Sequence, residues 1–340
     1  MIKPKSIIVL AYSFLLLFLN QKLVAQAQKS QFNQKEVTLT IDSISKKLIE
    51  NYVFPEVSKQ MAKMLGTNLK EGKYKSMVDH QALANQLTED LRSVSKDKHL
   101  QVIYNPSIIA RENARTDEDR ANEEAEWIQT LIRHLERDNY GFREVKILEG
   151  NVGYLDIREF NDPQYGGATL TNAMQFLSNT EALIIDLRNN DGGHPGMVQL
   201  LASYFFSEPV HYANQYNRPK DELTQAWTLP YVPGKRLSDV KLYILTSSKT
   251  FSAAEAFSYF MKHLGRATIV GEKTSGGAHL TGSVIATDKF YVRIPQGRPT
   301  STVTNSNWEG TGVIPAIEIG EEQALKTAYE KALKTLEDRR

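Results

Sequence analysis

The stretch Ala182-Leu-Ile-Ile-Asp-Leu-Arg-Asn-Asn-Asp-Gly-Gly193 decides the fold of this 340-residue chain. It begins with an almost continuous apolar run to Leu187, which is typical of a parallel strand that is buried on both faces. Two glycines follow, and Pro195 then opens a predicted helix to about Phe206, since proline suits the first turn of a helix. A buried strand, a glycine turn and a helix together make one βα unit.

Similar units lie on both sides of this stretch. Val152–Ile157 is a predicted strand before a helix over 168–177, and Leu242–Leu245 and Ala267–Val270 are predicted buried strands around a helix over 252–264. Repeated βα units imply a mostly parallel sheet with helices packed on it. The predicted fold class is therefore α/β.

The whole chain divides into five predicted parts. Residues 34–95 carry apolar residues at helical spacing in three stretches, which predicts a small helical bundle. We expect a signal peptide over 1–27, the helical bundle over 28–98, a connector of one strand and one charged helix over 99–143, the α/β domain over 144–320 and a C-terminal helix over 321–340. Residues 210–236 are rich in aromatic and turn residues and are expected to line a cleft.

The N-terminal leader predicts export. Lys3 and Lys5 precede an apolar run over 7–19, and the small-residue pattern Ala25-Gln-Ala27 follows, which together describe a secretory signal peptide. The run is shorter than the roughly 20 residues that a membrane-spanning helix needs, so a retained membrane anchor is the less favoured alternative. We expect a periplasmic or secreted protein with no stable membrane insertion after cleavage.

Composition excludes several classes of function. The chain has no cysteine, which excludes disulfides and lipoprotein attachment, and its formal net charge is +1. Loss of the leader removes Lys3, Lys5 and Lys22 and no acids, so the mature chain stays near neutral without the clustered basic residues of a nucleic-acid-binding protein. No HExxH or paired ligand spacing is present, and we expect neither a metal nor another cofactor.

Two segments at the ends of predicted strands carry candidate chemistry. Gly192 and Gly193 leave backbone N–H groups open toward a cavity, which suits an oxyanion, although the pair taken alone favours a tight strand-to-helix turn. Ser252 begins a predicted helix and forms the pattern Ser-x-x-Glu with Glu255, so spacing alone favours a capping box. A hydroxyl at that place also lies beside free N–H donors that stabilise an anionic intermediate.

A carboxylate and a base complete the set of candidates. Glu309 lies in the glycine-rich turn Trp308-Glu-Gly-Thr-Gly312, where it is able to orient an imidazole, although a solvated turn acid is the more common fate. Seven histidines compete for the role of base. His99 begins a predicted strand after a polar segment, and His194 and His279 each adjoin a Gly-Gly pair.

The ordered set of these motifs resembles the tail-specific, C-terminal-processing serine peptidase family. The matching segments are Asp186–Gly193, Thr246–Glu255, His263–Ala267, Val270–His279 and Trp308–Pro315. The most similar branch contains interphotoreceptor retinoid-binding protein modules, and the tricorn protease core is a more distant relative. The resemblance implies a ClpP/crotonase-like β-α spiral with a small helical N-terminal domain.

The resemblance also assigns roles to residues. The nucleophile is Ser252, the oxyanion donors are the N–H groups of Ala253 and Gly193, with Gly192 as an alternative, and the base and its carboxylate partner are His99 and Glu309. The implied activity is hydrolysis of peptide bonds in a peptide or protein substrate through an acyl-enzyme on Ser252.

The chain departs from the family pattern at three places. The lysine that pairs with the serine in many C-terminal-processing members is replaced by Gly277, and the serine that precedes the histidine in tricorn is replaced by Lys98. No PDZ domain is recognisable, so a preference for C-terminal tails does not carry over. The alternative function is a non-catalytic module for apolar ligands of the retinoid or fatty-acid type, and the sequence leaves the substrate and the oligomeric state open.

Overall fold

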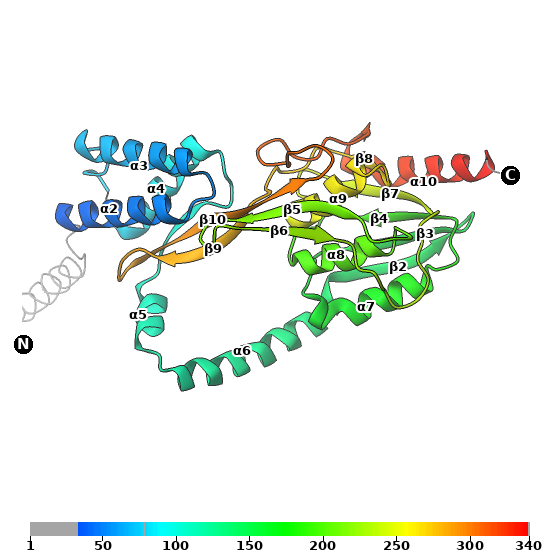
Figure 1. The fold of residues 1–340 in the computed structure, drawn as a ribbon, viewed down its shortest axis with the longest axis horizontal. Coiled ribbons are helices and arrows are strands. Elements are labelled where there is room, and N and C mark those ends of the chain that lie inside the picture. Colours follow the sequence, from blue (N-terminus) through cyan, green and yellow to red (C-terminus); the bar gives the residue numbers. More distant parts are fainter. Residues whose placement is uncertain (1–32, 78, 339–340) are drawn as a thin grey trace, which may run out of the picture.

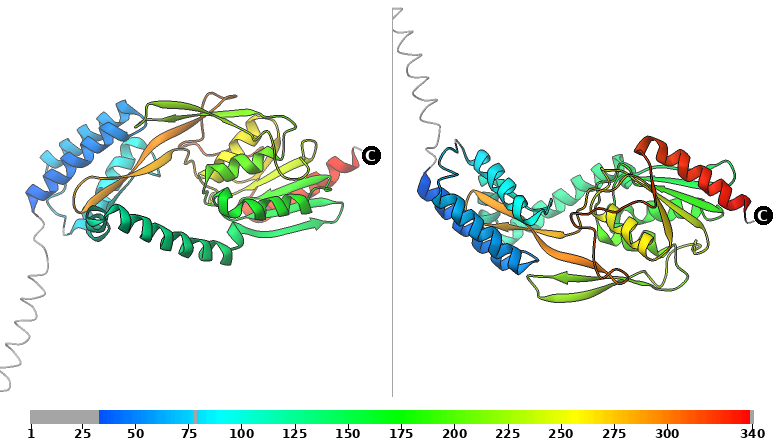
Figure 2. Two further views of the ribbon diagram at one scale, coloured as in Figure 1. Left: turned by 60° about the horizontal axis from the view of Figure 1, so that its bottom comes forward. Right: turned by 90° about the horizontal axis from the view of Figure 1, so that it is seen from above.

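The computed structural model of this protein describes residues 33–77 and 79–338. Helices α2–α4 lie at one end of the molecule, a sheet with helices α7–α10 lies at the other end, and strand β10 runs between the two (Figure 1). Both views of Figure 2 show the same arrangement. The expected signal peptide falls outside the described residues. Within the described part of the chain, no helix has both the length and the apolarity that crossing a membrane requires.

The predicted helical bundle is present. It consists of α2 (Gln34–Asn51), α3 (Pro55–Lys70) and α4 (His80–Ser95). The side chains of Asn33 and Asp79 accept backbone hydrogen bonds at the starts of α2 and α4, as N-cap residues do. The apolar faces of these helices share one core with Phe290, Val292 and Ile294 of β10. The three helices and this part of β10 therefore form one packed unit, which we call the helical unit, although they are far apart in the sequence.

An antiparallel sheet joins this helical unit to the rest of the molecule. Its strands run in the order β1-β10-β5-β6, with β9 paired to the other side of β10. Their bounds are β1 (Gln101–Tyr104), β5 (His211–Asn217), β6 (Glu222–Trp227), β9 (Leu280–Ile285) and β10 (Phe290–Ser301). Sequence analysis did not predict β9 and β10, and the β5–β6 hairpin lies within the segment expected to be rich in turns.

The connector contains two helices where one was expected. They are α5 (Pro106–Ala114) and α6 (Asp117–Arg137), and the short η1 (Asn139–Gly141) follows. Thr116 begins α6 with a capping box to Asp119, so the chain restarts there as a separate helix. Trp127 on α6 has 62% of its surface exposed.

The second sheet is mostly parallel, as predicted. Its order is β11-β8-β7-β4-β3-β2, and only the β2–β3 pairing is antiparallel. The bounds are β2 (Phe142–Leu148), β3 (Val152–Ile157), β4 (Ala182–Asp186), β7 (Lys241–Thr246), β8 (Ala267–Gly271) and β11 (Ile317–Glu318). All residues of β4 are buried between β3 and β7, which explains its continuous apolar sequence.

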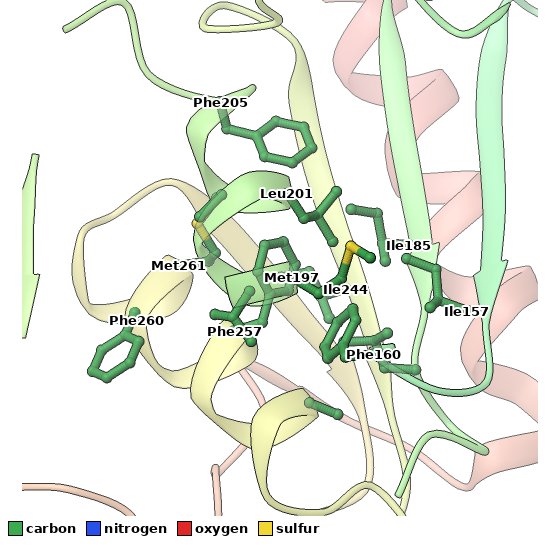
Figure 3. Close-up of a cluster of buried hydrophobic side chains, with 14 of the residues drawn as sticks. Ile157, Phe160, Ile185, Met197, Leu201, Phe205, Ile244, Phe257, Phe260 and Met261 are labelled. Carbon is green, nitrogen blue, oxygen red and sulfur yellow. The ribbon is translucent and has the colours of Figure 1, made fainter. Parts of the chain in front are cut away.

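Helices cover both faces of this sheet. Leu183 and Ile185 of β4 point to the core under α7 (Pro163–Phe176), α8 (Pro195–Ser203) and α9 (Ala253–His263), where α8 and α9 place their apolar side chains (Figure 3). Ala182 and Ile184 point to the opposite face under α10 (Glu321–Glu337), because successive strand residues alternate between faces. We call this part the sheet domain. An α/β domain with a small helical N-terminal domain is thereby confirmed.

Candidate active site

Ser252 lies between the end of β7 and the start of α9 with an unusual backbone conformation. Its φ is 52° and its ψ is −115°, outside the regions that residues with a side chain normally adopt. Strained residues of this kind concentrate at functional sites and persist only where their surroundings hold them. The neighbouring N–H of Phe251 donates to the carbonyl of Asn190 at 3.1 Å, which ties the Ser252 loop to the glycine loop that follows β4.

Glu255 holds the Ser252 loop from inside the protein. Its fully buried carboxylate accepts hydrogen bonds from the N–H of Ser252 at 2.9 Å, the N–H groups of Gly276 and Gly277 at 2.6 and 2.8 Å, and the hydroxyl of Thr274 at 2.5 Å. Burial raises the pKa of Glu255, and the four hydrogen bonds oppose that rise because they favour the charged form. One carboxylate thus fixes two loops of the site.

The glycine loop approaches Ser252 closely. Gly192 and Gly193 have φ values of 112° and 128°. A Cβ atom on Gly192 would lie 2.7 Å from the Cβ of Ser252, and one on Gly193 would lie 2.1 Å from the carbonyl oxygen of Phe160. No other residue fits at either place without moving the backbone, since positive φ and close contact both exclude a side chain.

Two backbone N–H groups beside Ser252 have no acceptor. The N–H of Gly192 donates to Oδ1 of Asn190 at 2.9 Å. In the described part of the chain, the N–H groups of Gly193 and Ala253 make no hydrogen bond, and Ala253 is the first residue of α9, where an N–H has no partner in the helix. Gly193 and Ala253 are therefore the two donors that remain available to an anion.

His99 reaches the site from the helical unit. Its ring stacks on the ring of Phe251, the residue before Ser252, with centroids 4.7 Å apart and planes 28° from parallel. Its side chain is 10% exposed. A Cβ atom on Gly277 would lie 2.7 Å from Cε1 of His99 and 2.1 Å from Cε2 of Phe251, so these two rings occupy the space beside Gly277.

Asp97 is a buried acid that sequence analysis passed over as part of a polar linker. Its Oδ1 accepts a hydrogen bond from the N–H of His99 at 3.0 Å and lies 3.7 Å from Nδ1 of the same residue. Its Oδ2 lies 2.6 Å from Nδ1 of His279. Burial by itself raises the pKa of Asp97, but the hydrogen bonds from His279 and His99 and the charge of His279 hold that pKa well below its usual range. The spacing Asp-x-His was the one signal available in the sequence.

Glu309 lies in the same cluster. Its Oε2 accepts a hydrogen bond from the N–H of Ala278 at 2.6 Å and lies 3.4 Å from Nδ1 of His279. Burial and then the charge of Asp97 raise the pKa of Glu309. Among the described residues, no hydrogen bond or ion pair joins Glu309 to His99.

The cluster contains the atoms that a metal ion would need. Ligand atoms of Asp97, His279 and Glu309 lie within 4.8 Å of one another. The hydrogen bond between His279 and Asp97 accounts for the closest pair without an ion.

His194 and Lys98 contact groups outside the cluster of Asp97, His279 and Glu309. Nδ1 of His194 accepts a hydrogen bond from the N–H of Gly196 at 3.1 Å at the start of α8, and its Nε2 lies 3.5 Å from Asp162. Nζ of Lys98 donates to the carbonyl of Ser275 at 2.6 Å, which links the segment of His99 to the sheet domain.

An apolar pocket opens beside Ser252. Ser252, Gly193 and Ala253 form part of its wall, and its cavity volume is about 50 Å³. The remaining wall is mostly apolar and includes Val198, Tyr212, Ala256, Phe260, Pro299 and Trp308. The pocket therefore places apolar surface next to the hydroxyl and the two vacant N–H groups.

Known protein families match both the helical unit and the sheet domain. Residues 151–319 match the profile of peptidase family S41, and residues 23–143 match the profile described as the N-terminal domain of Peptidase_S41 in eukaryotic IRBP. A "Probable CtpA-like serine protease" of Staphylococcus epidermidis is 26% identical over 199 residues, which are 53% of this chain and 40% of that protein. The chain thus matches less than half the length of this curated relative.

Solved structures share the fold. A putative peptidase from Parabacteroides merdae superposes with a TM-score of 0.62 at 19% identity, over 87% of this chain and 96% of that one. The tricorn protease gives a TM-score of 0.57 at 14% identity, over 89% of this chain and 37% of that one. The ClpP/crotonase-like spiral expected from the sequence is confirmed by these matches. Because profiles for the helical unit and for the sheet domain match in the order found in one family, the chain belongs to peptidase family S41.

Proposed function

We propose that this protein is an exported serine peptidase with Ser252 as its nucleophile. The observation that carries the proposal is the strained backbone of Ser252 at the start of α9, beside the vacant N–H groups of Gly193 and Ala253. Membership of family S41 supports the same reaction class. Export rests on the leader sequence alone.

The reaction follows from the groups around Ser252. His99 takes the proton from the Ser252 hydroxyl, and the oxygen attacks the carbonyl carbon of the scissile peptide bond. The N–H groups of Gly193 and Ala253 stabilise the oxyanion that forms. His99 then gives its proton to the leaving amine, and a water molecule hydrolyses the acyl-enzyme by the same steps. Glu309 supports the imidazolium through the cluster with His279 and Asp97.

A second candidate function is binding of an apolar ligand without catalysis. The observation that favours it is the apolar wall of the pocket beside Ser252. A binding module needs no strained serine and no vacant N–H groups, and for this reason we place it second.

Labelling with a fluorophosphonate probe tests the proposal. We expect the probe to attach covalently to Ser252 and Ser252→Ala to abolish labelling, because the probe requires an activated hydroxyl. Ser248→Ala is the matched control, since Ser248 is an exposed serine on the same loop. A folded wild-type protein that takes up no probe between pH 6 and pH 9, and that binds a fluorescent fatty acid, would favour the binding function.

A further inference from the structure

The cluster of Asp97, His279 and Glu309 beside His99 contains two carboxylates, although one is enough to orient an imidazole. Asp97 and Glu309 both lie near His279, but in the described part of the chain only Asp97 has an oxygen within 4 Å of a ring nitrogen of His99. Nδ1 of His99 and Oε1 of Glu309 are both buried and make no hydrogen bond among the described residues. The two acids are therefore not equivalent partners of His99.

The position of Asp97 fits a direct partner of His99. Its Oδ1 already accepts the backbone N–H of His99 at 3.0 Å, so the carboxylate and the imidazole are held on the same short segment. The 3.7 Å between this oxygen and Nδ1 is longer than a hydrogen bond, and such contacts often tighten only when substrate is bound.

The second oxygen of Asp97 is held by other groups. Nδ1 of His279 donates to Oδ2 at 2.6 Å, and the hydroxyl of Tyr52 donates to it at 3.4 Å. His279 is 4% exposed, and its ring packs edge-on against Phe54 with centroids 5.3 Å apart. Oε2 of Glu309 contacts His279 from the other side at 3.4 Å. Glu309 therefore reaches Asp97 through His279.

We infer that Asp97 is the carboxylate that positions His99, and that His279, held between Asp97 and Glu309, positions Asp97. The inference deepens the proposed function and rests on it for the role of His99 in catalysis. Asp97 keeps the proton of the neutral imidazole on Nδ1 of His99, which leaves Nε2 free to accept the Ser252 proton. When Nε2 takes that proton, the charge of Asp97 stabilises the imidazolium. Asp97, His279 and Glu309 are positioning residues.

The inference predicts different labelling rates for the variants Asp97→Asn and Glu309→Gln. An asparagine at 97 can present its NH₂ group to Nδ1 of His99, which moves the imidazole proton to Nε2 and leaves no acceptor for the Ser252 proton. We expect the rate of fluorophosphonate labelling to fall by about 10³–10⁴ in Asp97→Asn. In Glu309→Gln, Asp97 and His279 remain, and we expect a loss of less than about tenfold, in the range of an indirect effect.

The tautomer of His99 is the second readout, and loss of packing alone would not change it. Nitrogen NMR of ¹⁵N-histidine-labelled protein distinguishes Nδ1–H from Nε2–H, and the signals of His99 are those lost in His99→Gln. We expect the Nδ1–H form in wild type and Glu309→Gln, and the Nε2–H form in Asp97→Asn. His134→Gln is the matched control, because His134 is exposed on α6. Asp97→Glu keeps a carboxylate and should keep the Nδ1–H form if Asp97→Asn fails to fold.

Two results would overturn the inference. One is an unchanged His99 tautomer in Asp97→Asn, and the other is a Glu309→Gln variant that changes the tautomer or loses labelling as severely as Asp97→Asn. The NMR measurement does not require peptidase activity. If wild type shows the expected tautomers but takes up no probe, the proposed function fails while the placement of Asp97 beside His99 stands.

Discussion

The helical unit and the sheet domain contribute different kinds of group to the site. The sheet domain supplies the strained Ser252 and the backbone donors Gly193 and Ala253, which lie in loops that follow parallel strands or at the start of the next helix. The segment that follows the helical unit's last helix supplies side chains, His99 and Asp97. Backbone geometry fixes the first set, whereas the second set depends on how the two parts pack against each other.

The acids of the two parts also differ in the direction in which their pKa values are shifted. The pKa of Asp97 is held below its usual range, since hydrogen bonds from His279 and His99 outweigh its burial. Burial raises the pKa values of Glu255 and Glu309 in the sheet domain. The pKa of the acid beside His99 is thus lowered, whereas the pKa values of the two sheet-domain acids, which accept backbone N–H groups, are raised.

The largest expected effect comes from removing hydrogen bonds of Glu255 in the sheet domain. Glu255→Gln replaces one oxygen with an NH₂ group, so two of the four donors lose their acceptor. At about 1–3 kcal/mol for each, we expect a loss of roughly 2–6 kcal/mol in the free energy of unfolding, together with loss of probe labelling. Urea denaturation measures the first and the fluorophosphonate reaction the second. A variant that is both stable and active would show that Glu255 does not hold the Ser252 loop.

A glycine substitution in each part sharpens the comparison. Gly193→Ala places a Cβ atom against the carbonyl of Phe160 and displaces one oxyanion donor, and we expect the labelling rate to fall by about 10²–10³. Gly66→Ala lies within α3 with no atom near the added Cβ. We expect this control to raise stability by roughly 0.5–1 kcal/mol, because alanine favours a helix, and to leave labelling unchanged. Equal behaviour of the two variants would contradict the account of the glycine loop.

The smallest effect concerns the dependence of stability on pH. A carboxyl whose folded-state pKa is lowered adds stability above its unfolded pKa of about 3.9, and this contribution disappears as the pH falls through the lower folded-state value. The stability advantage of wild type over Asp97→Asn, about 1–3 kcal/mol at neutral pH, should therefore shrink in acid. Glu309 has a raised pKa, so Glu309→Gln should gain stability relative to wild type as the pH rises. Urea unfolding at pH 3, 5 and 7 measures both, and slopes of the same sign would contradict the assignment.

Most of the sheet domain follows from local sequence, and the parts that do not have physical reasons. The apolar run at 182–187 predicts a buried strand, and β4 is buried along its whole length. The helical spacing of Val37, Ile41, Ile44 and Leu48 predicts one buried helix face, and all four residues are buried in α2. Strand β10 contains Pro295, Gly297 and Pro299, residues that disfavour a strand, and a bulge lies between the first two of them. One charged helix was expected in the connector, but the chain forms α5 and α6, and the start of α6 depends on the capping residue Thr116.

The candidate site shows the same limit. Ser252 and the glycine pair could be selected because each follows a strand whose pattern is visible in the sequence. The place of Asp97 beside His279 could not, since 182 positions separate the two residues and only the packing of the helical unit against the sheet domain brings them together. The roles of His99 and Glu309 came from resemblance alone and remain proposals.

The crowding around Gly277 limits which side chains this position accepts. The family resemblance places a lysine of other members at this position, but here the rings of Phe251 and His99 occupy the space that even a methyl group at 277 would need. A lysine at 277 therefore fits only if the ring of Phe251, which lies nearest to the added Cβ, moves or is replaced by a smaller side chain.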